Sequence, residues 1–275
     1  MGEPLIDEEN RSFWDELCGS QAAEMLGIND SSPESLKKFD DWYFDFYPYL
    51  KPFLSAVAHP DIRLLEVGLG YGTVSEYLAE IGVAYSGLDI AQGPVNMVTA
   101  RLASKELQGD AHLGSILSPP FPSQSFDAVV AIGSLHHTGD LQEAISTCHS
   151  LLVPGGKLLF MVYNAYSYRR WLHSTNATFR LALREGTGYR GVVGDTDDRQ
   201  RGLYDTNRAG DGAPHTDWIS RRSLNFMLRD FRSTDFRLLN MDSDFPPFRT
   251  MQREKMLRSR WGARLGLDIY VQAVK

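Results

Sequence analysis

Three glycines at every second position mark the stretch of this chain that is best suited to holding a ligand. Gly68, Gly70 and Gly72 follow Glu66, and Thr73 begins a run with helical spacing of apolar residues. Glycine adopts positive φ without a steric clash and lets a ligand approach the backbone. The helix that follows offers unpaired N–H groups in its first turn. The stretch predicts a strand, a ligand-binding turn and a helix; an ordinary strand-to-helix turn of another α/β protein is the alternative.

The spacing of these glycines excludes two kinds of nucleotide site. A dinucleotide fingerprint, G-x-G-x-x-G, needs a glycine three residues after Gly70, where this chain has Thr73. No Gly-Lys-Ser/Thr follows, which excludes a phosphate-binding P-loop. A glycine turn preceded by the carboxylate of Glu66 instead fits a cofactor that carries a cation and no pyrophosphate.

Three further polar side chains stand at the ends of predicted strands. Asp89 lies near the end of a strand over residues 84–90, where a carboxylate can accept two hydrogen bonds from a ribose diol. Capping of the next helix is the alternative role. His136 and His137 follow an apolar strand over residues 126–132 and could supply a general base, because imidazole titrates near neutral pH. Alternatively, one histidine packs or caps a helix and the other orients the cofactor.

The elements that position these residues alternate between strand and helix. Short turns join them, which predicts a parallel sheet with right-handed crossovers and helices on both faces. Two later apolar runs are expected to form a closing pair of strands. The predicted strands cover residues 64–67, 84–90, 111–116, 126–132, 157–163, 236–241 and 267–273.

The stretch Arg63–Leu78, RLLEVGLGYGTVSEYL, resembles motif I of the class I S-adenosylmethionine (SAM)-dependent methyltransferases. Residues 121–164, with the pattern FPSQSFD…LHH…LVPGGKL, resemble the region that follows the motifs of the same family. Together the two stretches cover about residues 62–164. The resemblance implies a Rossmann-like α/β fold with a mostly parallel seven-stranded sheet. It also implies SAM as the cofactor and S-adenosylhomocysteine as its product.

The resemblance further implies which residues bind the cofactor. Glu66 would anchor the methionyl amino group, directly or through water, and Asp89 would bind the ribose. Many members carry an aspartate after the third strand for the adenine amino group, but Ser115 stands there in this chain. The adenine contact then depends on Ser115 or on the backbone near Ile116. The expected cofactor-binding set is Glu66, Gly68, Gly70, Gly72, Thr73, Asp89, Ile90, Ser115, Ile116, Gly133 and Ser134.

The chain divides into four expected segments. Residues 1–60 form an N-terminal helical lid, 61–164 the SAM-binding core, 165–217 an insertion after strand five that covers the substrate, and 218–275 the rest of the core. An aromatic stripe in the helix after Pro33 either packs in the core or covers the ligands. The candidate catalytic residues are His136, His137, His215 and Tyr43, with Asp205, Tyr163, Tyr166 and Tyr168 as rival orienting groups.

Composition limits the classes of partner. A net charge of −7 over 275 residues argues against nucleic acid, which requires a basic surface. No apolar run is long enough to cross a bilayer, and the acidic N-terminus lacks the pattern of a signal peptide. Cys18 and Cys148 lack metal-site spacing, and the aspartates between residues 195 and 211 lack the calcium-loop pattern. We therefore expect a cytoplasmic protein without metal, membrane or nucleic-acid partners, and we consider a homodimer.

These observations predict a SAM-dependent methyltransferase that acts on a small molecule. The methylated atom is expected to be oxygen or nitrogen, with carbon as a further possibility, in a secondary metabolite or a sugar-like compound. A catalytically inactive SAM-binding scaffold and a protein methyltransferase are the alternatives.

Overall fold

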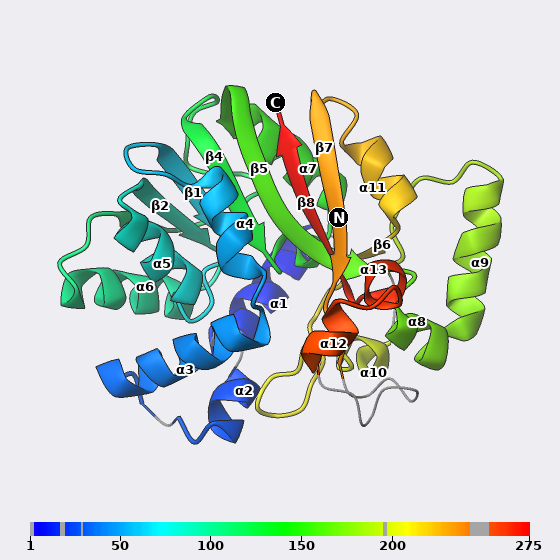
Figure 1. The fold of residues 1–275 in the computed structure, drawn as a ribbon, viewed down its shortest axis with the longest axis horizontal. Helices are drawn as coiled ribbons and strands as arrows, with labels where there is room; N and C mark the ends of the chain where they lie inside the picture. Colours follow the sequence, from blue (N-terminus) through cyan, green and yellow to red (C-terminus); the bar gives the residue numbers. More distant parts are fainter. Residues whose placement is uncertain (1–2, 17–19, 29, 195–196, 243–252) are drawn as a thin grey trace.

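A central β-sheet with helices on both faces organises the chain (Figure 1). The computed structural model describes residues 3–16, 20–28, 30–194, 197–242 and 253–275. Within them the strands are β1 Arg63–Val67, β2 Ala84–Asp89, β3 Asp110–Leu113, β4 Phe126–Ile132, β5 Leu152–Asn164, β6 Trp218–Ile219, β7 Ser233–Leu239 and β8 Asp268–Val274.

The strand order confirms the expected Rossmann-like architecture. The strands follow the order β3-β2-β1-β4-β5-β8-β7, and β8 runs antiparallel to both β5 and β7. The order reverses between β1 and β4, and such a reversal is the place where open α/β sheets bind ligands at the carboxyl ends of their strands. Seven strands were expected and eight are present in the described residues, because the short β6 pairs with the end of β5.

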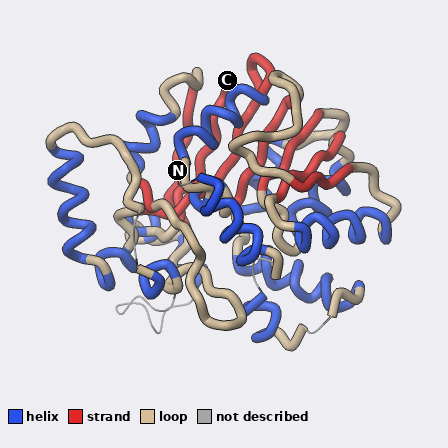
Figure 2. Tube along the Cα trace, turned by 180° about the vertical axis from the view of Figure 1, so that it is seen from behind, coloured by secondary structure: helices blue, strands red, loops and turns tan. Residues whose placement is uncertain are grey.

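Helices flank the sheet and crowd its carboxyl edge. Figure 1 shows α1, α2 and α3 across the lower end of the sheet, with α8, α10 and α12 at the same end, and Figure 2 gives the view from behind. The helices are α1 Glu3–Trp14, α2 Ser20–Met25, α3 Pro33–Phe46, α4 Leu50–Val57, α5 Thr73–Ile81, α6 Gln92–Ser104, η1 Leu135–His137, α7 Leu141–Leu151, α8 Tyr168–His173, α9 Thr175–Gly186, α10 Asp198–Arg201, α11 Arg221–Met227, α12 Arg253–Leu257 and α13 Gly262–Leu265.

The alternation of side chains along the strands creates two cores. In β4, Ala128 and Val130 face one side, where α4, α5 and α6 pack. Val129 and Ala131 face the other side, where α7 and α11 pack. A strand buried on both faces needs a continuous apolar sequence, which is what residues 128–132 provide.

Three local features interrupt otherwise simple elements. The segment before α11 is not helical, because Trp218 and Ile219 pair with β5 as β6 and Ser220 then caps the helix. Helices α8 and α9 meet at Ser174, where the helical run is broken. Strand β5 begins at Leu152, earlier than the expected strand over residues 157–163, and the register with β4 shifts between Phe126 and Ala128.

A buried ion-pair network fixes the N-terminal helices against the core. Arg101 of α6, with 1% of its side chain exposed, lies 2.8 Å from Asp40 of α3 and 3.0 Å from Glu76 of α5. Thr73, the first residue of α5, donates its hydroxyl to Asp40 at 2.5 Å. The network therefore ties α3 to the helix that follows the glycine turn.

Replacement of Arg101 tests this network. Arg101→Ala leaves two carboxylates without their buried cation, so we expect the free energy of unfolding to fall by about 3–5 kcal/mol. The half-exposed Lys105, which also pairs with Glu76, is the control, and Lys105→Ala should cost less than about 1 kcal/mol. Urea unfolding measures both, and equal losses in the two variants would contradict the structural role of Arg101.

Candidate functional site

The glycine turn is bound to the end of β2. Gly68, Gly70 and Gly72 have φ values of 84°, 50° and 76°, which an L side chain rarely adopts. The N–H of Gly68 donates to the carbonyl of Leu88 at 2.9 Å. One carboxylate oxygen of Asp89 accepts the N–H of Leu69 at 2.7 Å, and the other accepts the N–H of Ala91 at 2.9 Å. Asp89 thus stands beside the turn and keeps lone pairs for a ligand.

The same turn contacts the end of β4. Ser134 donates its hydroxyl to the carbonyl of Val67 at 2.6 Å. A Cβ on Gly68 would lie 2.4 Å from the Cβ of Ser134, so only glycine fits at this position. This contact places the histidines that follow Ser134 next to the glycine turn.

Glu66 lies beneath the turn with 3% exposure. It accepts the hydroxyl of Tyr85 at 2.6 Å. Burial raises the pKa of Glu66 from its usual 4.5 to about 7, and the hydrogen bond from Tyr85 opposes that rise. Near neutral pH this carboxyl is therefore close to half-protonated in the absence of a cation beside it.

The histidine pair is fully buried at the end of β4. The rings of His136 and His137 lie 4.2 Å apart, and the ring of Tyr163 at the end of β5 lies 4.2 Å from that of His136. Neither nitrogen of His136 has a hydrogen-bond partner among the described residues. Burial lowers the pKa of both histidines, that of His136 most strongly. Both imidazoles are therefore neutral near neutral pH and able to act as bases.

The end of the insertion is attached to the histidine pair by backbone contacts. Asp217 donates its N–H to the carbonyl of His136 at 2.7 Å, and Nδ1 of His137 lies 2.7 Å from the carbonyl of His215. The imidazole of His215 points to Asp217, with Nε2 3.1 Å from its carboxylate. The insertion also brings the carboxylate of Asp205 to 3.5 Å from Nε2 of His137.

Helix α1 covers the same edge of the sheet. The Asn10 side chain donates to the carbonyl of His137 at 2.8 Å, and the Trp14 ring lies 4.8 Å from the His137 ring. Asp15 accepts the N–H of Gly93 at the start of α6. A hollow of about 270 Å³ opens beside the turn, lined by Asp15, Glu16, Ile28, Asp30, Ser31, Tyr71, Gly93 and Arg208. Asp15 and Glu16, which directly follow α1, therefore form one wall of the space next to the glycine turn.

The remaining predicted residues lie farther from this centre or have other partners. The hydroxyl of Thr73 is taken by Asp40, and Ser115 accepts the N–H of Leu117 at 3.3 Å. The Ile116 side chain is part of the core under α7. Tyr43 has ring contacts with the aromatic side chains of α3 and its C-terminal end, namely Phe39, Trp42, Phe44 and Tyr47. Ile90 and Gly133 flank the ends of β2 and β4.

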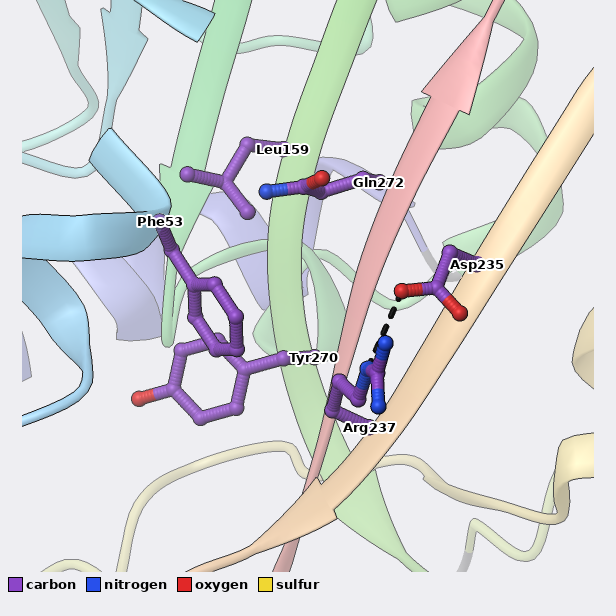
Figure 3. Close-up of a pocket in the computed structure, with 6 residues that line it drawn as sticks. All are labelled: Phe53, Leu159, Asp235, Arg237, Tyr270 and Gln272. Carbon is purple, nitrogen blue, oxygen red and sulfur yellow. Dashed lines mark hydrogen bonds and ion pairs between the residues drawn. The ribbon is translucent and has the colours of Figure 1, made fainter. Parts of the chain in front are cut away.

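A second hollow lies on the sheet face away from this edge. It is a shallow space of about 10 Å³ between Phe53, Leu159 and Tyr270, and its polar members are Gln272 and the Asp235–Arg237 ion pair (Figure 3). Its two charged groups pair with each other, so it offers no chemistry comparable to that of the histidine pair. In the described part of the chain, no group of three or more His, Cys, Asp or Glu side chains could hold a metal ion; Cys18 and Asp195 lie outside that part.

Sequence reasoning missed the residues of α1. Asn10 and Trp14 of α1, and Asp15 just after it, contact the site, whereas the aromatic stripe of α3 was expected either to pack in the core or to cover the ligands. The stripe packs in an apolar cluster beside the turn, with the Phe39 ring stacked 4.3 Å from the Tyr71 ring. A short polar helix at the start of a chain carries no signal of what it will contact, so the sequence could not have identified these residues.

Comparisons with known proteins agree with this geometry. Residues 65–160 match the family described as a methyltransferase domain. A ubiquinone biosynthesis O-methyltransferase of Xanthomonas campestris is 36% identical over 129 residues, which are 46% of this chain and 50% of that protein. The chain thus spans about half the length of the curated relatives it matches.

Solved structures show the same fold. A SAM-dependent methyltransferase from Methanosarcina mazei aligns with a TM-score of 0.55 and 20% identity, over 82% of this chain and 97% of that one. A SAM-dependent methyltransferase from Mesorhizobium loti aligns with a TM-score of 0.52 and 17% identity, over 83% and 97%. The domain match and the fold together confirm the resemblance that the glycine turn and the LHH block indicated.

The fit of Gly68 against Ser134 can be tested with a matched pair of glycines. Gly68 and Gly155 have φ values of 84° and 80°, but a Cβ on Gly155 would meet nothing within 4 Å. Both alanine variants incur backbone strain of about 1–2 kcal/mol. Gly68→Ala adds overpacking of about 1–3 kcal/mol, so its melting temperature should be clearly the lower one. Equal melting temperatures would show that the Ser134 contact is not tight.

The protonation of Glu66 predicts a pH dependence of stability. A buried carboxyl whose pKa is about 7 in the folded chain, against 4.5 when unfolded, binds its proton more tightly when folded. Its contribution to stability is therefore present below pH 4.5 and is lost as the pH rises through 7.

Glu66→Gln cannot ionise and keeps an acceptor for Tyr85. Relative to the unmodified chain, the variant should gain roughly 3 kcal/mol of unfolding free energy between pH 4.5 and pH 8. Denaturant unfolding across that range measures the difference. A difference that does not change with pH would contradict the burial of this carboxyl.

Proposed function

We propose that this chain, which carries a methyltransferase domain with the class I fold, transfers the methyl group of SAM to an oxygen atom of a small molecule. One observation supports this most strongly. The bond from Ser134 to Val67 joins the glycine turn, where a cofactor of this family is held, to a pair of buried neutral histidines. Cofactor and proton acceptor would thus be neighbours at one edge of the sheet.

The residues at this edge fit the chemical groups of SAM. Asp89 is buried beside the turn with lone pairs left for the ribose hydroxyls, and burial raises its pKa. Glu66 is a buried carboxyl under the turn and would become the partner of the methionyl ammonium, directly or through water. Gly70 gives the turn its positive φ, and Gly72 lets Arg101 and Val98 of α6 pack closely against the turn. Ser115, Ile116, Ile90 and Gly133 lie at the strand ends on either side and would line the adenine and methionyl ends.

The four predicted segments would each have a different role at the site. Residues 61–164 hold the cofactor, and 218–275 complete the sheet. Residues 1–60 cover the site from one side through α1, and 165–217 cover it from the other through the backbone contacts of His215 and Asp217. An acceptor enclosed by both covers is small, which favours a metabolite over a protein substrate.

The chemistry required from the protein is limited. SAM supplies an activated methyl group and its leaving group when bound. The chain must align the acceptor in line with that methyl, exclude water, and remove a proton from the acceptor. His136 and His137 are the proposed bases. Tyr43, which lies among the rings of α3, and His215, which pairs with Asp217, are less direct candidates.

Oxygen is proposed as the acceptor atom because the curated relatives are named as O-methyltransferases. Nitrogen or carbon methylation, a protein substrate and a SAM-binding scaffold without turnover are the competing functions. The net charge of −7 supports a partner other than nucleic acid. No helix in the described residues is long and apolar enough to cross a membrane. A cytoplasmic location and a homodimer are further proposals.

A labelled-methyl assay separates these functions. We expect transfer of label from methyl-labelled SAM to a hydroxyl compound in a panel of phenols, sugars, amines and peptides. Label on peptides alone would favour a protein methyltransferase. Binding of S-adenosylhomocysteine without transfer to any member would favour the scaffold.

Replacement of Asp89 tests the cofactor site itself. Asp89→Asn keeps the size of the side chain but cannot accept two ribose hydrogen bonds as an anion, so the affinity for S-adenosylhomocysteine should fall by about 10–100-fold. Asp110, exposed at the start of β3, provides the control, and Asp110→Asn should leave the affinity unchanged. Isothermal titration measures both. An unchanged affinity in Asp89→Asn would remove Asp89 from the site.

A further inference from the structure

A carboxylate of the insertion lies against the histidine pair, and the function proposed above does not use it. Asp205 follows α10, and its Oδ2 lies 3.5 Å from Nε2 of His137. Tyr163, near the end of β5, donates its hydroxyl to the two oxygens of Asp205 at 3.0 and 2.9 Å. The insertion, the end of β4 and the end of β5 thus each contribute one polar side chain to the same point.

The partners of His137 determine which ring nitrogen can accept a proton. Nδ1 lies 2.7 Å from the carbonyl oxygen of His215. A carbonyl oxygen can only accept, so Nδ1 carries the hydrogen and Nε2 of the neutral ring carries the lone pair. Nε2 has no hydrogen-bond partner among the described residues, and it faces Asp205. The proton-accepting nitrogen therefore points to the carboxylate.

Burial determines the charge of this pair. It lowers the pKa of His137, and the negative charge of Asp205 is the largest opposing influence. It also raises the pKa of Asp205, against the influences of His137, the Tyr163 hydrogen bond and Arg169. Because the Tyr163 hydroxyl donates to both oxygens of Asp205, and Arg169 adds positive charge nearby, we infer an ionised carboxylate beside a neutral imidazole, a pair with one negative charge. A proton that enters the pair is stabilised by both groups.

We propose that Asp205 and His137 together accept the proton that a hydroxyl acceptor loses when it is methylated. The inference rests on the proposed function. As the acceptor oxygen bonds to the methyl carbon, the carbon–sulfur bond breaks and leaves its electron pair on sulfur. The hydroxyl proton passes by way of Asp205 to Nε2 of His137, and from there to solvent. The side chain of Asp205 is 15% exposed and that of His137 only 6%, so an acceptor reaches the carboxylate first.

The charge of the pair also limits the acceptor class. A carboxylate or phosphate close to the reacting hydroxyl would be repelled by Asp205, whereas an uncharged phenol or alcohol would not. A hydroxyl bound at Asp205 would also lie beside the rings of Tyr163 and His136, which are 4.2 Å apart and suit an aromatic or apolar neighbour. The geometry thus favours an uncharged hydroxyl compound, a phenol above all.

Several charged or titratable groups surround the pair and contribute to its titration. They come from every element packed against it. They are His136 of η1, Tyr163 of β5, Arg169 of α8, Asp268 of β8, and His215 and Asp217 at the end of the insertion; helix α1 contributes the neutral Asn10 and Trp14. Burial raises the pKa of Asp268 to about 7, so this carboxyl titrates in the same range as the pair.

Nuclear magnetic resonance of the full chain tests the pair without an acceptor. The chain carries ¹⁵N-labelled histidine and bound S-adenosylhomocysteine, and His137→Gln assigns the signals. Asp205→Asn removes the carboxylate that supports the imidazolium, so the pKa of His137 should fall. Tyr163→Phe removes hydrogen bonds that stabilise the ionised carboxylate, so the pair should bind its proton more tightly and the pKa should rise. Asp211→Asn, an exposed change in the same insertion, should leave it unchanged.

Opposite shifts in these two variants would not follow from a general loosening of the insertion. A His137 pKa that stays the same in Asp205→Asn would overturn the proposal, whatever the chain methylates. If Asp205→Asn fails to fold, Tyr163→Phe and Asp205→Glu decide. A higher His137 pKa in Tyr163→Phe, together with a near-normal His137 pKa in Asp205→Glu, supports the pair. An unchanged His137 pKa in Tyr163→Phe overturns it.

The pH profile of methyl transfer tests the catalytic use of the pair. With the best hydroxyl acceptor from the labelled-methyl panel, Asp205→Asn should lower kcat on the order of 10²-fold. The acid limb of the kcat–pH profile of this variant should move to lower pH, because His137 alone is protonated at a lower pH than the pair. KM for SAM should stay unchanged. A fall in kcat with an unmoved acid limb, or a loss confined to the KM for SAM, would contradict the relay.

The two proposals fail differently. If no hydroxyl compound is methylated while the His137 pKa responds to Asp205, the proposed function is wrong and the catalytic part of this inference is lost with it. If methylation occurs but neither the His137 pKa nor the acid limb responds to Asp205, only the relay is wrong.

Discussion

Two hydrogen bonds at the glycine turn hold the site together. Asp89 accepts the N–H of Leu69, which ties the turn to the end of β2, and Ser134 donates to the carbonyl of Val67, which ties it to the end of β4. Because β2 and β4 lie on either side of β1, these bonds fix the turn at the place where the strand order reverses. The Cβ clash at Gly68 shows how close this approach is. Any ligand at the turn is therefore also next to the residues after Ser134.

The rest of the site depends on that arrangement. His136 and His137 follow Ser134 directly, and the insertion is attached to them through the backbone of His215 and Asp217. The insertion also packs around a small apolar cluster that includes Ala165, Leu181 and Trp218, and the backbone contacts fix its end at the histidines, which explains how a long connection can carry functional side chains. Helix α1 uses the same histidines, because Asn10 bonds to the carbonyl of His137. Helix α1 and the insertion therefore both contact the same short 3₁₀ helix, η1.

The parts that the sequence predicted well are those with strong local signals. The continuous apolar run of residues 128–132 and the glycines at 68, 70 and 72 determine a strand and a turn whatever the rest of the chain does. The resemblance then supplied the Rossmann-like fold with its mostly parallel sheet. Other features depend on contacts distant in sequence. Trp218 forms a strand only because β5 is beside it. Arg101 can be buried because it pairs with Asp40, a residue 61 positions earlier in the sequence. Asp205 was one of several rival groups until the fold brought it to His137.

The central claim is that the glycine turn, the end of β2 and the start of η1 form one site for SAM. Hydrogen–deuterium exchange of the full chain with and without S-adenosylhomocysteine tests it most directly, because exchange locates protection along the backbone. The account predicts slower exchange at residues 68–73, 89–92 and 133–137, with no comparable effect of NAD. Unchanged exchange in these three segments at saturating S-adenosylhomocysteine, or protection by NAD in its place, would contradict the claim.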